Sequence, residues 1–171
     1  EIATGSSYVI VGAYADDDNG IDSGSVYVYD ANDLSATPTK LTAFDGATGD
    51  TFAEKVAATA NKIVVVAKRD DDNGNRSGSA YVYDINDLSA TPTKLTAFDG
   101  AADDEFGISV ATTDDKIIVG ASGDESSTGS VYVYDANDLS AQPTKLTAFD
   151  GAASDNFGIS IATAADKIIV G

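Results

Sequence analysis

The sequence contains no cysteine and no histidine. Without cysteine the chain has neither a disulfide framework nor thiolate chemistry. Without histidine it lacks the commonest general base, the usual zinc ligand and the central member of a Ser-His-acid triad. These two absences exclude several common classes of enzyme and of metal site.

Basic residues are scarce as well. Lys and Arg total 10 against 28 Asp and Glu, which gives a formal net charge of −18. The field of such a chain repels nucleic acid and anionic membrane surfaces, so we predict neither as a partner. No stretch reaches the roughly 18 consecutive apolar residues of a membrane span, so we predict no membrane insertion. The acidity fits either a solubilising surface or a saline, cation-rich setting.

The sequence does contain a unit that occurs three times. Its most regular copy runs from Phe106 to Phe149, and a fresh Phe-Gly-Ile-Ser begins at Phe157. Phe52 to Phe106 is 106 − 52 = 54 residues and Phe106 to Phe157 is 157 − 106 = 51 residues. Because such a unit buries its faces against its neighbours, we predict a tandem array rather than one compact domain.

Each unit is predicted to contain four strands, which in the third unit are residues 106–112, 116–120, 130–134 and 145–149. The first alternates apolar and small residues, the second and third are apolar on both faces, and the fourth alternates as an edge strand does. Repeated four-stranded sheets packed face to face are typical of a β-propeller. We therefore predict an all-β fold, a β-propeller-type array of four-stranded antiparallel blades with about three and a quarter repeats.

The whole chain, residues 1–171, is predicted to form this single array. Its parts are a first, incomplete blade (1–45), a second blade (46–99), a third blade (100–150) and the start of a fourth (151–171). An open array of this kind exposes strand edges and an apolar face at its ends, so we also predict self-association through the incomplete end blades.

The connections use one turn chemistry in every unit. Asn-Gly in the loop between the second and third strands supplies a positive φ. Asn32, Asn86 and Asn137 are predicted to cap a single helical turn between the third and fourth strands. A proline six residues later then forces an extended exit, because proline disfavours helix in the residue before it.

The run Phe-Gly-Ile-Ser-Val-Ala, then Ile-Ile-Val-Gly-Ala, then Gly-Ser-Val-Tyr-Val-Tyr resembles the FG-GAP repeat, the blade of integrin alpha-type β-propellers and of many bacterial and algal surface proteins. The resemblance covers essentially the whole chain. It implies a propeller that serves in extracellular recognition or adhesion. The family's calcium loop between the first and second strands is missing here, where the chain reads 4–7, 58–61, 112–115 and 163–166. Two other departures are Ala53 and Val66, which replace glycines of the pattern.

A different acidic loop offers candidate metal ligands, which are Asp16, Asp18, Asp22, Asp70 and Asp72. Acids in a turn rich in carbonyl groups suit a hard cation such as calcium, although the spacing differs from that of an EF-hand. In the second unit Arg69 and Arg76 replace Ala15 and Asp22, and these cations would oppose a metal ion or neutralise the acids. The loop is therefore either a calcium site or a solvated acidic hairpin tip. No other cofactor is predicted.

Catalysis is not predicted. The acids at 103–105 and at 155 precede the first strand near one rim, and two carboxylates could in principle hydrolyse a glycoside. Every acid recurs with the period, however, whereas a catalytic site is normally singular. The tyrosines of the third strands could form a platform for sugars, but their alternation with valine favours packing between blades.

Three functions remain, and we rank them in this order. The first is a non-enzymatic extracellular or cell-surface module for adhesion, or for recognition of a protein or glycan. The second is a structural subunit that assembles head to tail into a filament or another polymer. The third is a carbohydrate-acting enzyme on a propeller scaffold, which would need an acid pair that breaks the period.

Overall fold

The computed structural model describes residues 1–5, 7–164 and 167–171. Residue 6 and residues 165–166 belong to the first and last of the four loops that lack the calcium motif, and they lie outside the described residues. The described chain folds into three four-stranded antiparallel sheets and one two-stranded sheet. The predicted all-β, propeller-type array of four-stranded blades is therefore confirmed.

The strands follow one another in chain order within each sheet. The first sheet holds β1 (Ile2–Thr4), β2 (Tyr8–Ala13), β3 (Ser25–Asp30) and β4 (Thr39–Leu41). The second holds β5 (Val56–Ala58), β6 (Lys62–Ala67), β7 (Ser79–Asp84) and β8 (Thr93–Leu95). The third holds β9 (Ser109–Thr112), β10 (Lys116–Ala121), β11 (Ser130–Asp135) and β12 (Thr144–Leu146), and the last pairs β13 (Ile161–Ala164) with β14 (Lys167–Val170).

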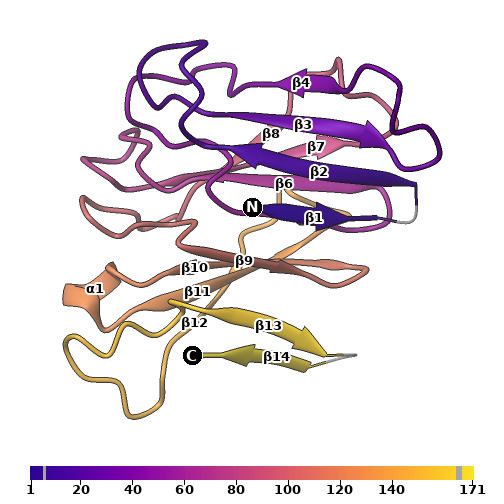
Figure 1. The fold of residues 1–171 in the computed structure, drawn as a ribbon. Coiled ribbons are helices and arrows are strands. Elements are labelled where there is room, and N and C mark those ends of the chain that lie inside the picture. The colour runs from indigo at the N-terminus through magenta and orange to yellow at the C-terminus, as the bar shows by residue number, and fades with distance from the viewer. Residues whose placement is uncertain (6, 165–166) are drawn as a thin grey trace.

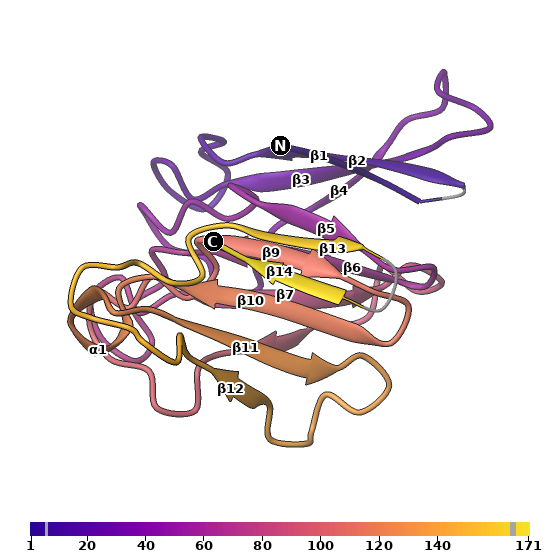
Figure 2. The same ribbon diagram turned by 90° about the horizontal axis from the view of Figure 1, so that it is seen from below.

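The sheets are stacked one after another along the chain, from the first sheet in indigo to the two-stranded sheet in yellow (Figure 1). The first strands of successive sheets contact each other, β1 with β5, β5 with β9 and β9 with β13. Seen from below, these strands lie close together while the third and fourth strands spread outwards (Figure 2). This fan is the arrangement of propeller blades about an axis.

Two apolar cores lie between the three complete sheets. One joins residues of the first and second sheets, including Ile10, Val26 and Tyr81, and the other joins the second and third, including Val66, Ile117 and Tyr132. The middle strands of the second sheet, β6 and β7, are buried on both faces because a sheet covers each side, which explains their unbroken apolar runs. Tyr81 and Tyr132 are fully buried, so the prediction that the tyrosines pack between blades holds for the second and third sheets. In the first sheet Tyr27 and Tyr29 are only half-buried.

The linker between two sheets docks on a Ser-Gly pair in the sheet that precedes it. Phe106 N donates a hydrogen bond to Ser77 O over 3.0 Å, and Phe52 N donates to Ser23 O over 3.2 Å. The glycine that follows the serine, Gly78, has φ +83, and a Cβ on it would lie 2.0 Å from Phe106 O. Only glycine allows the linker backbone to approach so closely.

Some local predictions are wrong. The first strand begins at Ser109 instead of Phe106, because Gly107 has φ +100 and Ile108 N donates to Glu105 O in a turn. The fourth strand is shorter than predicted and spans Thr144–Leu146.

The predicted helical turn capped by Asn32, Asn86 or Asn137 is also wrong. The acceptor is the aspartate two residues earlier, and Asp30 Oδ1 takes hydrogen bonds from Asn32 N and Nδ2 at 2.8 and 3.1 Å. These Asx turns compete with helix, because the side chain satisfies the backbone locally. The helical segment α1 (Asp124–Ser127) contains Glu125 and Ser126 at positive φ and is an irregular turn.

Candidate functional site

The acidic loops between the second and third strands of each sheet lie on one rim of the array. Each of the first two loops is closed by a serine, as Ser77 Oγ accepts from Asn73 N and donates to Asp70 O, both at 3.1 Å. Gly74 takes φ +128, which confirms the expected positive φ of the Asn-Gly turn. The loop therefore holds its acids in a fixed arrangement.

A lysine of the fourth strand points into each acidic loop. Lys94 Nζ lies 2.7 Å from Asp45, 2.9 Å from Asp70 and 2.5 Å from Asp72. Asp45 comes from the linker that follows the preceding sheet, so the ammonium group ties that linker to the loop. We refer to Asp45, Asp70, Asp72, Tyr81 and Lys94 as the Lys94 cluster.

Equivalent clusters occur in the other two complete sheets. Lys40 Nζ lies 3.0 Å from Asp16 and 2.5 Å from Asp18. Lys145 Nζ lies 2.8 Å from Asp99 and 2.7 Å from Asp124. The arrangement repeats because Thr-Lys-Leu recurs in every fourth strand and places the lysine on the same face.

A tyrosine hydroxyl completes the Lys94 cluster. Tyr81 Oη lies 2.7 Å from Asp45 Oδ1 and 3.0 Å from Asp70 Oδ2. The Lys94 ammonium also lies 5.2 Å from the centre of the Tyr81 ring, within the range of a cation–π contact. The tyrosine thus packs its ring in the core and directs its polar end to the rim.

Burial and charge shift the pKa values of this cluster. Burial alone would lower the pKa of Lys94, but its hydrogen bonds to the aspartates hold that pKa above the ordinary value. Burial likewise opposes ionisation of Asp45, yet the bonds from Lys94 and Tyr81 keep the pKa of Asp45 below its ordinary value. Burial and the neighbouring aspartates raise the pKa of Tyr81. The cluster is therefore a charged network whose tyrosine stays protonated.

The structure brings together some of the five predicted ligands. Asp70 and Asp72 share Lys94, and Asp16 and Asp18 share Lys40. Asp22 contacts its loop through its backbone, because its N–H donates a hydrogen bond to Asp17 Oδ1 at 2.9 Å. The oxygens of Asp45, Asp70 and Asp72 lie within 4.8 Å of one another, a spacing that could hold a metal ion.

Sequence reasoning did not find Asp45 or the lysines. Both recur with the period, in Asp-Gly-Ala and in Thr-Lys-Leu, so their recurrence was the signal that could have found them. Of the two arginines, Arg76 contacts Glu105 and lies 3.7 Å from Asp103, which are acids of the next linker. Arg76 therefore neutralises the linker acids and leaves Asp70 and Asp72 to Lys94.

Calcium binding stays a prediction, and the structure shows which group would compete with the ion. A calcium ion among Asp45, Asp70 and Asp72 would have to displace the ammonium group that lies there. We therefore expect calcium to stabilise a Lys94→Met variant more than the unaltered chain, by about 5–10 °C in melting temperature at about 100 times Kd. Calorimetry with calcium and with chelator tests this, and unchanged transitions in both proteins would contradict the calcium prediction.

A buried carboxyl beside the cluster gives a pH prediction. Asp50 is buried and accepts a hydrogen bond from Ala47 N at 2.7 Å, and burial raises its pKa to about 6 from 3.8. Because the folded pKa lies above the unfolded one, the stability from Asp50 is complete below about pH 4 and is lost as pH rises through about 6. Asp50→Asn keeps the acceptor and should therefore be more stable than the unaltered chain at pH 8, with the advantage gone by pH 4.

Urea unfolding of both proteins between pH 4 and pH 8 measures this difference. Asp155→Asn is the matched control, since Asp155 accepts the same bond from Ala152 N at 2.7 Å but is exposed. A constant stability difference between Asp50→Asn and the unaltered chain across the range would refute the assignment.

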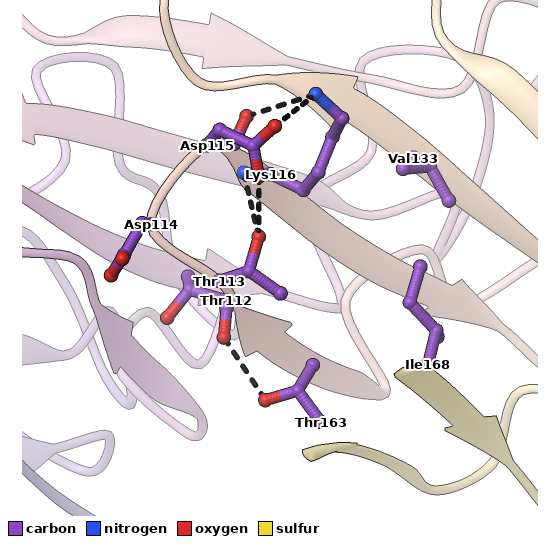
Figure 3. Close-up of a pocket in the computed structure, with 8 residues that line it drawn as sticks. All are labelled: Thr112, Thr113, Asp114, Asp115, Lys116, Val133, Thr163 and Ile168. Carbon is purple, nitrogen blue, oxygen red and sulfur yellow. Dashed lines mark hydrogen bonds and ion pairs between the residues drawn. The ribbon is translucent and has the colours of Figure 1, made fainter. Parts of the chain in front are cut away.

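A cavity lies beside the two-stranded sheet, away from the acidic rim. It has a volume of about 710 Å³ and is lined by Thr112, Thr113, Asp114, Asp115, Lys116, Val133, Thr163 and Ile168. Figure 3 shows Val133 and Ile168 facing each other on one side and the Thr113–Lys116 turn on the other. Thr163 Oγ1 donates to Thr112 O at 3.1 Å and closes one end. The cavity is thus walled by the third sheet and the two-stranded sheet.

Comparison with known proteins identifies a repeat family from the sequence and a similar fold from the structure. A family model described as FG-GAP repeat matches residues 1–29, 37–83, 91–134 and 141–171. No curated protein matches the chain. Among solved structures the chain is similar to TolB from Acinetobacter baumannii, with a TM-score of 0.50 and 14% identity over 90% of this chain and 33% of that one.

The chain thus spans about a third of the length of that TolB chain. At this identity the similarity concerns the fold alone, and it agrees with the propeller-type arrangement of the sheets. Within the described residues, no helix is long and apolar enough to span a membrane.

Proposed function

Because this chain belongs to the FG-GAP repeat family, we propose that it is a non-enzymatic extracellular module that recognises a protein or a glycan through the loops of its acidic rim. The observation that carries the proposal is the contrast between scaffold and loops. The sheets repeat strand by strand, whereas the third rim loop is shortened and irregular around α1. Binding residues are commonly found on such loops over a rigid scaffold.

The charge of the rim favours a basic partner. The lysine clusters leave exposed acids outside them, among which are Asp17 and Asp71. A chain of net charge −18 attracts cationic surfaces over long range. Of the two partner classes, a protein with a basic surface therefore fits better than a neutral glycan.

The test uses a lysine-rich peptide and a panel of neutral glycans as probes. We expect the peptide to bind in low salt and the double variant Asp17→Asn, Asp71→Asn to bind it several-fold more weakly. Asparagine preserves the acceptor oxygens, because Asp17 and Asp71 accept backbone bonds at 2.9 and 2.7 Å. The control is Asp33→Asn with Asp87→Asn in the opposite loops. Equal weakening in both double variants, or binding of neither probe, would refute rim recognition.

A second function, head-to-tail assembly of copies into a polymer, is favoured by a different observation. The junction between sheets recurs with the same kinds of side chain, since Phe52 meets Tyr81 edge-on at 5.3 Å and Phe106 meets Tyr132 at 5.5 Å. A unit that stacks on a copy of itself within the chain can stack on a second chain in the same way, and head-to-tail contacts of this kind generate rings or filaments. Light scattering and negative-stain images of the purified chain test this function, and a single monomeric species at high concentration would refute it.

A further inference from the structure

One tripeptide of the acidic rim breaks the period of the chain. Asn75-Arg76-Ser77 is the single Asn-x-Ser/Thr sequence among the 171 residues, and this tripeptide is the acceptor motif for N-linked glycosylation. The equivalent positions of the first loop read Ile-Asp-Ser and so lack the asparagine. A motif of three residues arises often by chance, so the geometry of the loop has to support it.

The tip of the second acidic loop presents Asn75 to solvent. Asn75 is exposed, and its backbone carbonyl oxygen accepts a hydrogen bond from Asp103 N of the following linker at 2.7 Å. The contact that holds Asn75 in place is therefore made by its backbone. The amide group of its exposed side chain is left for the attachment of a sugar.

Other asparagines use the side-chain amide to hold a turn. Asn86 Nδ2 donates to Asp84 Oδ1 at 2.9 Å, and Asn156 Nδ2 donates to Ser154 O at 2.9 Å. Among the described residues, no hydrogen bond that closes the second loop is donated by Asn75 Nδ2. A bond from this nitrogen to a sugar therefore removes no contact on which the loop depends.

The hydroxyl of the motif is in the opposite situation. Ser77 is 2% exposed, and its Oγ accepts from Asn73 N and donates to Asp70 O, both at 3.1 Å. The motif requires serine or threonine at its third position, so a transferase has to recognise this hydroxyl together with the amide. Because the folded loop buries the hydroxyl, the sugar has to be attached before the loop closes.

We propose that Asn75 is the attachment site of an N-linked glycan, which is transferred to the chain before its second acidic loop folds. The donor is an oligosaccharide carried on a lipid diphosphate. A bond forms between Asn75 Nδ2 and the anomeric carbon of the first sugar, and the bond from that carbon to the diphosphate oxygen breaks. The amide passes one proton to a base of the transferase. The proposal rests on the extracellular location proposed above, because such glycans occur on surface loops of secreted proteins.

A glycan at this position would cover the second loop of the acidic rim. Arg76 N donates to Asp71 Oδ1 at 2.7 Å, so the exposed Asp71 belongs to the same turn as the attachment site. A bulky sugar there shields Asp71 from a basic partner. Asp17, its exposed equivalent in the first loop, has no such motif beside it. The glycan therefore directs recognition toward the loops that carry no sugar.

The first test is secretion of the chain from a eukaryotic cell with a signal peptide that the cell removes. We expect a mass above the 17.4 kDa of one chain, and digestion with peptide N-glycosidase should return it to that value. Because this digestion converts the modified asparagine to aspartate, peptide mass spectrometry locates the site at Asn75. The Asn75→Gln variant should be secreted without a glycan. Absence of the sugar from Asn75, in the secreted chain or in the chain isolated from its own organism, would overturn the proposal.

The first loop offers a matched variant that gains the motif. Ile21 is 67% exposed, and its carbonyl oxygen accepts from Gly49 N at 2.8 Å. Asp22 follows at φ 54, close to the φ 55 of Arg76. Ile21→Asn therefore places an Asn-Asp-Ser motif in the same geometry, and we expect a second glycan on the secreted variant. Leu34→Asn lies at a position that is 65% exposed but creates no motif, and it should gain none. A first-loop variant that gains no glycan would contradict the argument from loop geometry.

The order of transfer and folding is tested with purified transferase and its lipid-linked donor. A chain diluted from urea into the reaction should be modified at Asn75 about tenfold more than a chain that is already folded, because a stable fold rarely exposes Ser77. Equal modification of the two chains would overturn the order that we propose.

Binding of the lysine-rich peptide separates this site from rim recognition. We expect Asp71→Asn to weaken binding in the Asn75→Gln background, which carries no glycan, and to have no effect on the glycosylated chain. If neither form binds the peptide while Asn75 carries a sugar, rim recognition is wrong and the glycan site stands. If both forms bind and Asp71→Asn weakens them equally, the glycan does not shield the loop.

Discussion

Replacing Gly78 by alanine should lower the free energy of unfolding by about 3–5 kcal/mol, a large effect for one methyl group. The new Cβ would lie 2.0 Å from Phe106 O and 2.7 Å from Phe106 N. Both atoms belong to the linker backbone, so the linker must move away from the Ser-Gly pair on which it docks. Its movement would loosen the Phe106 ring, which is fully buried against Tyr132 and Tyr134.

Gly49→Ala separates this clash from the strain of a positive φ. Gly49 has φ +90, close to the value at Gly78, but nothing lies within 4 Å of its added Cβ. We expect this control to cost only about 1–2 kcal/mol, the penalty for a left-handed residue. Urea unfolding measures both variants, and similar losses in the two would show that close approach of the linker is not the reason for glycine at 78.

Replacing Lys94 by methionine should cost about 2–4 kcal/mol. The Lys94 side chain is 13% exposed and that of Asp70 is 4% exposed, so the substitution leaves a buried carboxylate without its cation. Removal of one partner of a buried pair typically costs about 3–5 kcal/mol, and the exposure of Asp72 reduces this figure here. Methionine preserves most of the length of the stem, so the loss reports on charge more than on packing.

Lys116→Met is the matched control. Lys116 lies 2.8 Å from Asp115 and 3.8 Å from Asp135, both of them exposed, and such pairs contribute about 0–1 kcal/mol. Thermal unfolding should show a drop of about 5–15 °C for Lys94→Met and at most a few degrees for Lys116→Met. A Lys94 variant as stable as the control would mean that the cluster is not a structural joint.

The fold was predictable because its signal is repeated. Period and strand number follow from runs such as Lys-Ile-Ile-Val and Val-Tyr-Val-Tyr, which recur with small changes in every unit. The same runs indicate the burial of both faces of β6 and β10. The start of the first strand was not predictable from alternation. Phe106 and Ile108 alternate as in a strand, but Gly107 takes a positive φ to bring the linker onto Ser77. A tertiary contact overrides the local pattern at this point.

The acidic site was predictable only in part. The acids of one loop lie close together in sequence, which is why the sequence indicates them as a group. Lys94 lies 24 residues from Asp70 and 49 residues from Asp45, so only the sheet topology brings the three together. The Asn caps failed for a local reason, since Asp84 lies two residues before Asn86 and captures its backbone N–H first.

The docking of each linker on the sheet that precedes it also has a mechanical meaning. A chain pulled from its two ends would load the Ser77–Phe106 bond and the Lys94 cluster in series with their equivalents in the other sheets. Because each sheet is joined only to its neighbours, the array should give way one unit at a time. A unit of 51 to 54 residues releases about 170–190 Å of contour length when fully extended. Force-extension traces should therefore show regularly spaced peaks, one for the unfolding of each unit. Each peak would dissipate part of the applied load while the other units stay folded.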